Sequence, residues 1–318
     1  MVAINRIVFM GTPDFAVPSL KALLEKGENV VCVVTQPDRP RGRGRKIVPP
    51  PVKELALQAA IPVLQPHSIK GDDFLADLAA FAPDIITLTA YGRILPRRLI
   101  NLPPHGTINV HGSLLPKYRG AAPIQWALIN GESETGVTIM QMDEGLDTGD
   151  ILLQERIAVE VDDTAATLAV KLADLGGNAL AKSLDLLRRE QLIPVRQDES
   201  QASFAPLLKK EDGLLDWSQS AARVSGLIRG LDPWPATYTT MNGSRLRLFS
   251  PVPVAENRCL QAYPEPGTIC RADPNGILVT TGNGCVLIRE IQAEGARRMP
   301  VAAFISGTII KPGTRLGR

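Results

Sequence analysis

An asparagine and a histidine stand two residues apart at the end of an apolar stretch. Asn109 and His111 close the segment Thr107–His111, whose sequence TINVH favours a β-strand. Because side chains alternate between the two faces of a strand, both project from the same face. A neutral amide beside an imidazole can bind an oxyanion and move a proton. The pair predicts a catalytic site, although a turn cap next to an ordinary strand-end histidine would give the same pattern.

A glycine-rich acidic segment supplies a third candidate for the same chemistry. Residues 142–150 read MDEGLDTGD and follow the strand-like run Gly136–Met142. Glycines permit tight turns with positive φ, and such a turn can carry Asp147 toward His111. A carboxylate there would hold the imidazole in one orientation. The alternative is a solvated acidic loop, since the spacing of an EF-hand is absent.

A strongly basic segment points to a different kind of partner. Residues 39–46 (RPRGRGRK) hold five cations interleaved with glycine and proline, which predicts a mobile surface loop. Arginines on such a loop suit contacts with RNA phosphates, although a merely solvated loop has the same composition. Residues 207–318 carry 14 basic and nine acidic side chains, hence +5, and residues 1–206 carry −3. The candidate phosphate contacts are Arg41, Arg43, Arg45, Lys46, Lys209 and Lys210.

Elements able to position these residues alternate along the first part of the chain. This alternation predicts an α/β domain with a largely parallel sheet over residues 1–190. The predicted strands are Arg6–Met10, Asn29–Thr35, Asp84–Thr89, Thr107–His111 and Gly136–Met142, and the predicted helices are 14–27, 52–60, 72–81 and 163–190. Residues 191–210 have the composition of a linker. In 211–318, a helix over 220–230 and short strand-like runs predict a small barrel or sandwich.

Several classes of protein are excluded by what the sequence lacks. The first strand is followed by Gly11-Thr12-Pro13-Asp14, which lacks two of the three glycines of a dinucleotide fingerprint and places a carboxylate where the pyrophosphate would bind. No apolar run approaches the length of a membrane span. Four cysteines without a C-x-x-C pair, in a chain without a signal-peptide pattern, favour reduced thiols, no zinc site and a cytosolic location.

The combined motifs resemble a known family. The segment NVHGSLLPKYRGAAPIQWA followed by MDEGLDTGD resembles the 10-formyltetrahydrofolate-dependent formyltransferases. The stretches IVFMGTPDFAVPSL, VTQPDRPRGRG, LTAYGRILP, DGLLDWS and IRGLDPWPATYT extend the likeness over essentially the whole chain. The SLLP core is common to several folate formyltransferases. Its combination with GLDTGD and the C-terminal segment is typical of the branch that acts on methionyl initiator tRNA.

This resemblance implies a fold, a reaction and a set of site residues. The expected architecture is a Rossmann-like catalytic domain (1–190), a linker (191–210) and an OB-like tRNA-binding barrel domain (211–318). The expected reaction transfers the formyl group of 10-formyltetrahydrofolate to the free amino group of methionyl initiator tRNA, bound by its acceptor stem, for bacterial translation initiation. We expect a monomer with no membrane partner and no active-site metal. The implied catalytic residues are Asn109, His111 and Asp147, and the implied folate-binding residues are Ser113, Leu114, Leu115, Pro116, Tyr91, Gly92, Arg93 and Ile94.

Three other interpretations remain open from the residues. A nucleotide-sugar formyltransferase would share HGSLLPKYRG, but the arginine-rich loop together with GLDTGDIL argues against it. A glycinamide ribonucleotide formyltransferase would normally be about one-third shorter. A non-catalytic RNA-binding module would need the basic loop but not the three catalytic candidates together.

Overall fold

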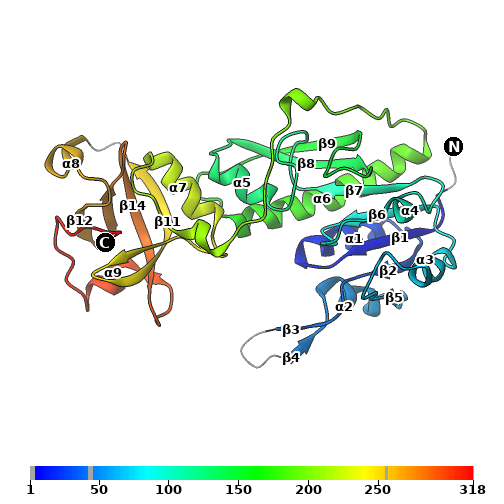
Figure 1. Cartoon of the computed structure of the whole chain (residues 1–318), viewed down its shortest axis with the longest axis horizontal. Coiled ribbons are helices and arrows are strands. Elements are labelled where there is room, and N and C mark those ends of the chain that lie inside the picture. Colours follow the sequence, from blue (N-terminus) through cyan, green and yellow to red (C-terminus); the bar gives the residue numbers. More distant parts are fainter. Residues whose placement is uncertain (1–3, 42–45, 255–256, 318) are drawn as a thin grey trace. The chain divides into compact units, whose positions relative to one another are not determined.

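The chain forms two compact units. The computed structural model describes residues 4–41, 46–254 and 257–317 (Figure 1). The first unit comprises Met1–Pro123, Glu134–Ile157 and Ala169–Ala205, and the second comprises Ile124–Ser133, Ala158–Leu168 and Pro206–Arg318. In the described part of the chain, no helix is both long and apolar enough to cross a bilayer.

A seven-stranded sheet organises the first unit, in the order β5-β2-β1-β6-β7-β8-β9. Its strands are β1 (Ile7–Gly11), β2 (Val30–Val34), β5 (Val63–Leu64), β6 (Ile85–Thr89), β7 (Thr107–His111), β8 (Glu134–Gln141) and β9 (Ile151–Ala158). The strands from β5 to β7 are parallel, whereas β8 runs antiparallel to β7. Every residue of β1, β6 and β7 is buried, as expected for parallel strands covered on both faces.

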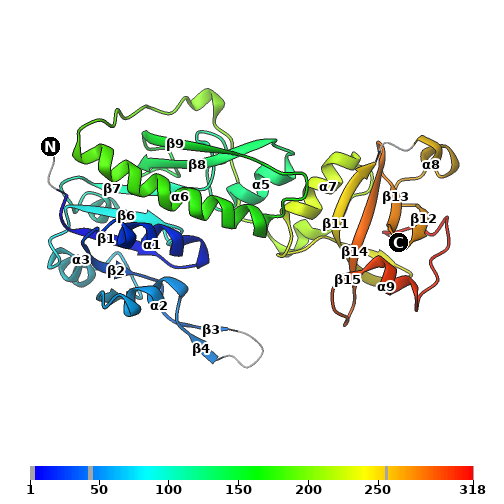
Figure 2. The same ribbon diagram turned by 180° about the vertical axis from the view of Figure 1, so that it is seen from behind.

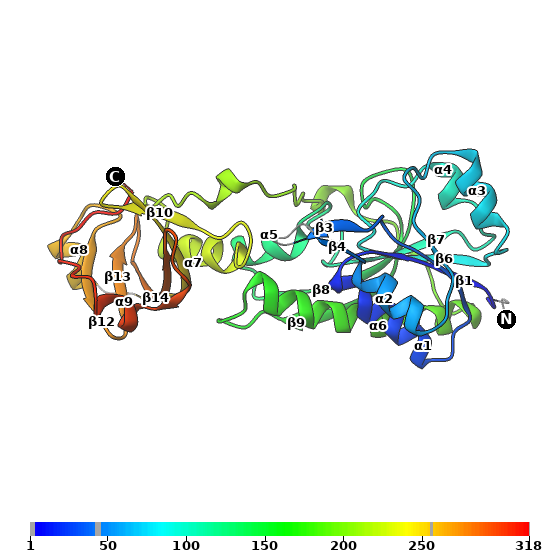
Figure 3. The ribbon, with the colours of Figure 1, turned by 90° about the horizontal axis from the view of Figure 1, so that it is seen from below.

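Helices cover both faces of this sheet. They are α1 (Val17–Glu25), α2 (Pro51–Gln58), α3 (Asp72–Ala79), α4 (Arg97–Ile100) and α6 (Ala165–Arg188), with a 3₁₀ turn η1 (Asp14–Ala16) before α1. Figure 2 shows α1 and α6 across one face, and Figure 3 shows α3 and α4 on the other. Apolar side chains of α3 and α4 pack against those of β1, β2 and β6. Because the helices cover the faces of the sheet, a ligand can reach the sheet at the ends of its strands.

The second unit is built on a six-stranded antiparallel sheet in the order β10-β11-β14-β13-β12, with β15 beside β14. Its strands are β10 (Tyr238–Met241), β11 (Ser244–Val254), β12 (Ile269–Asp273), β13 (Gly276–Thr280), β14 (Cys285–Ala293) and β15 (Met299–Pro300). Its helices are α5 (Pro123–Ile129), α7 (Ala221–Gly230), α8 (Asn257–Ala262) and α9 (Val301–Ile305), with a 3₁₀ turn η3 (Lys210–Gly213). Val224 and Ile228 of α7 join Trp217 in the core under the sheet.

The predicted fold class is confirmed, and two local predictions are wrong. The flanks of the basic segment are not a loop: β3 (Arg39–Arg41) and β4 (Lys46–Val48) pair as an antiparallel hairpin separate from the main sheet. Composition missed this hairpin because the pairing satisfies the backbone groups of two three-residue strands locally, and so short a pairing leaves no periodic pattern in the sequence. Reduced thiols throughout were also expected, but Cys259 and Cys270 form a disulfide. The predicted domain boundaries and linker remain predictions.

Candidate active site

Asn109 and His111 lie at the carboxyl end of β7, as predicted. The carboxyl ends of β1, β2, β6 and β7 meet at one edge of the sheet, where ligands bind in open α/β folds. Asn109 and His111 are opposite Met140 and Thr138 of β8 and are 7% and 5% exposed. Within the described residues, the buried Oδ1 atom of Asn109 has no hydrogen-bond partner. Because buried polar groups are normally satisfied, this amide is available for a polar ligand.

The orientation of the His111 ring is defined by two neighbours. Its Nε2 lies 2.9 Å from the backbone carbonyl oxygen of Tyr118. A carbonyl oxygen only accepts, so Nε2 carries the proton in the neutral ring. Its Nδ1 lies 3.6 Å from Oδ2 of Asp147, and both side chains are largely buried. That separation exceeds a hydrogen bond but suits an ion pair with a protonated ring. Nδ1 is therefore the nitrogen that can take up a proton beside a carboxylate.

The acidic loop brings Asp147 to His111 through local geometry. Asp147 has a φ of 54°, and its Oδ2 accepts a hydrogen bond from the backbone nitrogen of Gly120 at 2.9 Å. Asp143 accepts hydrogen bonds from the Thr148 hydroxyl at 2.7 and 2.8 Å, which closes the loop. At Gly149 any Cβ would overlap the carbonyl oxygen of Gln141. Glycine is thus required there by the close approach of two backbones.

The loop after β7 is anchored to β8. The Thr138 hydroxyl donates to the carbonyl oxygen of Ser113 at 2.7 Å and accepts from the backbone nitrogen of Leu115 at 3.1 Å. The Ser113 hydroxyl in turn donates to the carbonyl oxygen of Lys117 at 2.6 Å. Ser113 and Leu115 are buried, whereas Leu114 and Pro116 are half-buried. The loop residues predicted to contact folate are therefore held rigidly beside His111.

A buried polar network, missed from the sequence, supports Asp147. Gln197 is 4% exposed, and its Nε2 donates to the carbonyl oxygens of Asp147 and Gly149 at 2.8 and 2.7 Å. Its Oε1 accepts from Nε and Nη2 of Arg119 at 3.0 and 2.8 Å. Arg119 is 2% exposed and also pairs in a bidentate manner with Glu199, both bonds being 2.8 Å. Gln197 thus connects an arginine of the β7 loop to the backbone of the acidic loop.

The charges of this network are mutually stabilised. The hydrogen bond to Glu199 raises the pKa of Arg119, and the same bond lowers the pKa of Glu199. Backbone bonds also tie the segment down: the Arg119 nitrogen donates to the Ser203 carbonyl oxygen at 2.8 Å, and the Ala205 nitrogen donates to the Arg119 carbonyl oxygen at 2.7 Å. The polar composition of 197–205 carries no signal for this role, and of the network only Arg119 lies within a recognisable motif.

A pocket of about 450 Å³ lies at the ends of β1, β2 and β6. Tyr91 and Gly92 contribute to its wall, together with Thr12, Asp14 and Gln36, which lie in two stretches of the family resemblance but were not predicted as site residues. Tyr91 is fully buried, and its backbone carbonyl oxygen accepts from Gln36 Nε2 at 2.9 Å.

The next two residues predicted to bind folate, Arg93 and Ile94, are not among the described residues that line this pocket. Arg93 donates to the carbonyl oxygens of Pro66 and His67 at 3.2 and 3.0 Å. Ile94 is 84% exposed.

The predicted tRNA contacts fall in both units. Arg41 is the last residue of β3 and Lys46 is the first residue of β4, and the two are paired at the end of the hairpin. Arg43 and Arg45 lie outside the described residues. The base of the hairpin, with Arg39 and Val48, lines the same pocket as Tyr91. Lys209 and Lys210 are exposed at the start of η3 in the second unit. The first unit therefore has basic residues next to a pocket at its ligand-binding edge.

A parallel sheet with an N-x-H pair, a neighbouring aspartate and an anchored SLLP loop defines a class of acyl-transferring enzyme. The formyl transferase family matches residues 5–184, and the formyl transferase C-terminal domain matches residues 207–308. The chain belongs to the formyl transferase family.

Similar proteins cover nearly the whole chain. The methionyl-tRNA formyltransferase of Desulfotalea psychrophila is 54% identical over 311 residues, which are 98% of this chain and 95% of that protein. The methionyl-tRNA formyltransferase of Geobacter sulfurreducens is 49% identical over 312 residues, 98% of this chain and 96% of that protein. Among solved structures, the fold is similar to WlaRD, a sugar 3N-formyl transferase solved in the presence of dTDP and 5-N-formyl-THF. The TM-score is 0.67 at 18% identity, covering 93% of this chain and all of that one.

Proposed function

We propose that this chain transfers the formyl group of 10-formyltetrahydrofolate to the free amino group of methionyl initiator tRNA. The main support for this proposal is the largely buried group of Asn109, His111 and Asp147, in a chain that is 54% identical to a methionyl-tRNA formyltransferase over nearly its full length. The basic hairpin beside the pocket suits a polyanionic acceptor. We further propose that the chain acts in the cytoplasm as a monomer and binds the acceptor stem.

The donor presents a formyl carbon bonded to a nitrogen, and the acceptor presents a neutral amine. The partnerless amide oxygen of Asn109 fits a polar ligand, since a donor group of that ligand would satisfy it. During attack, the carbonyl electron pair moves onto the formyl oxygen, and the amide nitrogen of Asn109 donates a hydrogen bond to the resulting oxyanion. Ser113 to Pro116 and the backbone at Tyr91 and Gly92 would hold the donor.

Proton transfer is assigned to His111. With Nε2 donating to Tyr118, the neutral ring has its lone pair on Nδ1, which takes the proton that the attacking amine must lose. Asp147, 3.6 Å away, stabilises the imidazolium that forms. When the bond between the formyl carbon and the donor nitrogen breaks, His111 returns the proton to that nitrogen. Atoms and charge then balance without any further co-reactant.

Formyl transfer to charged tRNA tests the proposal directly. Purified protein is incubated with 10-formyltetrahydrofolate and methionyl initiator tRNA, with methionyl elongator tRNA and a nucleotide-linked amino sugar as alternative acceptors. We expect N-formylmethionyl initiator tRNA as the preferred product. Formylation of the sugar alone would reassign the acceptor, and tRNA binding without formylation of any acceptor would support a non-catalytic module.

Gln197→Ala is expected to lower kcat about tenfold and leave KM for both substrates nearly unchanged. The variant removes the two hydrogen bonds that position the backbone of the Asp147 loop and also leaves Arg119 partly unsatisfied. Unsatisfied buried groups cost about 1–3 kcal/mol each, so thermal stability should fall as well. Steady-state kinetics separates kcat from KM. The matched control is Gln201→Ala, an exposed glutamine of the same segment. Equal kcat in both variants would remove Gln197 from the positioning role.

Arg43→Ala is expected to weaken binding of methionyl-tRNA and to leave folate affinity unchanged. The base of the hairpin lines the pocket, whereas Arg43 lies outside the residues that the structure describes. Removal of one ion pair with a phosphate should reduce the slope of log affinity against log salt by about one unit, because one fewer counterion is released on binding.

The salt dependence of tRNA binding is measured for Arg43→Ala and for a control, Lys21→Ala. Lys21 is an exposed residue of α1, so its replacement removes the same charge from a different surface. Only Arg43→Ala should change the slope. Identical slopes in both variants would show that the loop is merely solvated, and a loss of folate affinity would place Arg43 at the folate pocket instead.

A further inference from the structure

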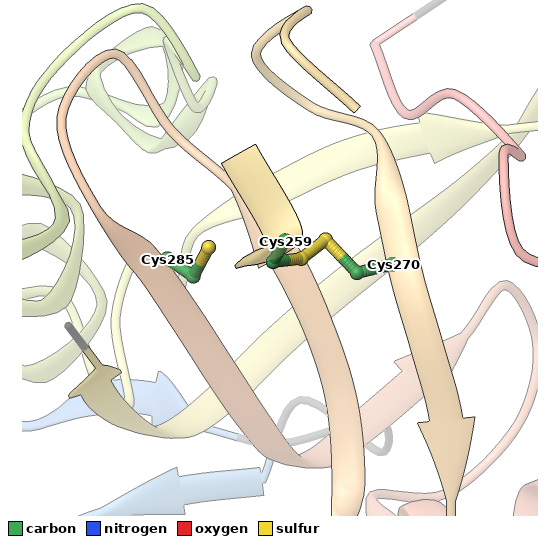
Figure 4. Close-up of side chains that lie close together, drawn as sticks. All are labelled: Cys259, Cys270 and Cys285. Atoms are coloured by element: carbon green, nitrogen blue, oxygen red, sulfur yellow. A yellow bond between two sulfur atoms is a disulfide. The ribbon is translucent and has the colours of Figure 1, made fainter. Parts of the chain in front are cut away.

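Three cysteines of the second unit converge on one point. Cys259 lies on α8, Cys270 on β12, and Cys285 is the first residue of β14 (Figure 4). Their three sulfur atoms all lie within 4.8 Å of one another. Cys259 and Cys270 are joined as a disulfide, and the sulfur of Cys285 points toward it. Three separate elements thus bring their thiol groups together.

The spacing matches what a thiophilic metal ion requires. Zinc–thiolate bonds of about 2.3 Å in a tetrahedral arrangement place sulfur atoms about 3.8 Å apart. Sulfurs already within 4.8 Å reach this spacing by side-chain rotation once the disulfide is opened. The backbone is held by the sheet, since β13 pairs with both β12 and β14, with Val279 opposite Ile269 and Thr280 opposite Cys285. Strand register therefore fixes the position of Cys285, and Cys270 lies at an irregularity of β12 between the paired residues Ile269 and Arg271.

The surroundings of the three sulfurs favour a soft ion with one open position. Cys259 and Cys285 are buried against Leu278, with Leu287 partly buried beside them, and Cys270 is half-buried. The cluster consists of these three cysteines, and among the described residues no histidine or carboxylate belongs to it. Thiolates select zinc and copper(I) over magnesium or calcium. Because Cys270 is half-buried, a water molecule could reach the ion and complete a tetrahedron.

We propose that the reduced second unit binds one Zn²⁺ ion through Cys259, Cys270 and Cys285, and that the disulfide is the metal-free form of the same site. Opening the disulfide needs two electrons, which a phosphine supplies: one phosphine and one water convert the disulfide into two thiols and a phosphine oxide. Zn²⁺ then displaces one proton from each of the three thiols. The two forms exclude each other, because the disulfide sulfurs have no thiolate charge to offer.

Metal titration of the full chain tests this site. The protein is reduced with a phosphine, freed of reductant without oxygen, and titrated with Zn²⁺ or with Co²⁺ as a spectroscopic probe. We expect one ion per chain, thiolate-to-cobalt charge-transfer absorption, visible bands of a tetrahedral ion, and release of protons. Air-oxidised protein should show none of these. Absence of binding to the reduced protein, or equal binding to the oxidised protein, would overturn the proposal.

Cysteine variants locate the ion. Cys270→Ser changes the half-buried ligand and should weaken Zn²⁺ binding at least about a hundredfold, since even residues that only support ligands are worth ten- to a hundredfold. Cys285→Ala should have the same effect, and it distinguishes a three-sulfur site from a simple dithiol. The matched control is Cys32→Ala, a buried cysteine of β2 in the first unit. Formyl-transfer activity verifies that each variant is folded. Unchanged affinity in Cys285→Ala, or equal loss in Cys32→Ala, would refute the assignment.

Discussion

His111→Ala is expected to lower kcat of formyl transfer by about two orders of magnitude or more, the usual scale for a lost acid–base group. The imidazole is 5% exposed at the end of β7, where Nδ1 faces Asp147 and Nε2 faces the Tyr118 carbonyl. Alanine removes the group to which we assign uptake of the proton from the amine. Single-turnover formylation at saturating tRNA and donor measures the chemical step directly.

The control for this prediction uses the opposite end of the same strand. His105 is half-buried just before the amino end of β7, and its backbone nitrogen donates to the Asp84 carbonyl oxygen at 3.0 Å. His105→Ala removes an imidazole from the same segment of chain but away from the edge that carries the site. It should keep nearly full activity. Normal single-turnover rates in His111→Ala, with the protein folded, would contradict the assigned proton transfer.

Asp147→Asn is expected to reduce kcat by about a hundredfold with little change in either KM. The amide keeps an oxygen that can accept from the backbone nitrogen of Gly120, so the loop retains its anchor. The variant lacks the negative charge 3.6 Å from His111 Nδ1, and with it the stabilisation of the imidazolium formed during transfer. Steady-state kinetics with both substrates varied gives kcat and both KM values.

The matched control for Asp147 lies three residues further along the chain. Asp150 is exposed, so Asp150→Asn removes one charge from the same acidic loop without touching His111. It should retain near-normal kcat. If the two variants lost activity equally, the effect would come from the charge of the loop as a whole. If Asp147→Asn raised KM alone, Asp147 would serve binding and not proton transfer.

The architecture could be predicted from the sequence because it depends on local patterns, whereas the roles of Asn109, His111 and Asp147 were implied by the family resemblance and remain predictions. The run TINVH has the composition of a strand, and it ends at the edge where parallel sheets bind ligands, so Asn109 and His111 had to share a face. The turn that carries Asp147 differs from the expected one, because the positive φ of 54° lies at Asp147 itself, and Gly149 serves instead to let two backbones approach closely.

Contacts between distant parts of the chain were decided only by the tertiary structure. Gln197 and Arg119 are 78 residues apart, and nothing in their local sequence distinguishes a polar linker from a buried clamp on the Asp147 loop. Cys270 and Cys285 are drawn together because β13 pairs with both of their strands. Their spacing in the chain resembles no metal-binding or disulfide motif. Periodicity and turn chemistry act over a few residues, whereas burial of a polar network or a cluster of sulfurs depends on which surfaces the folded sheet brings into contact.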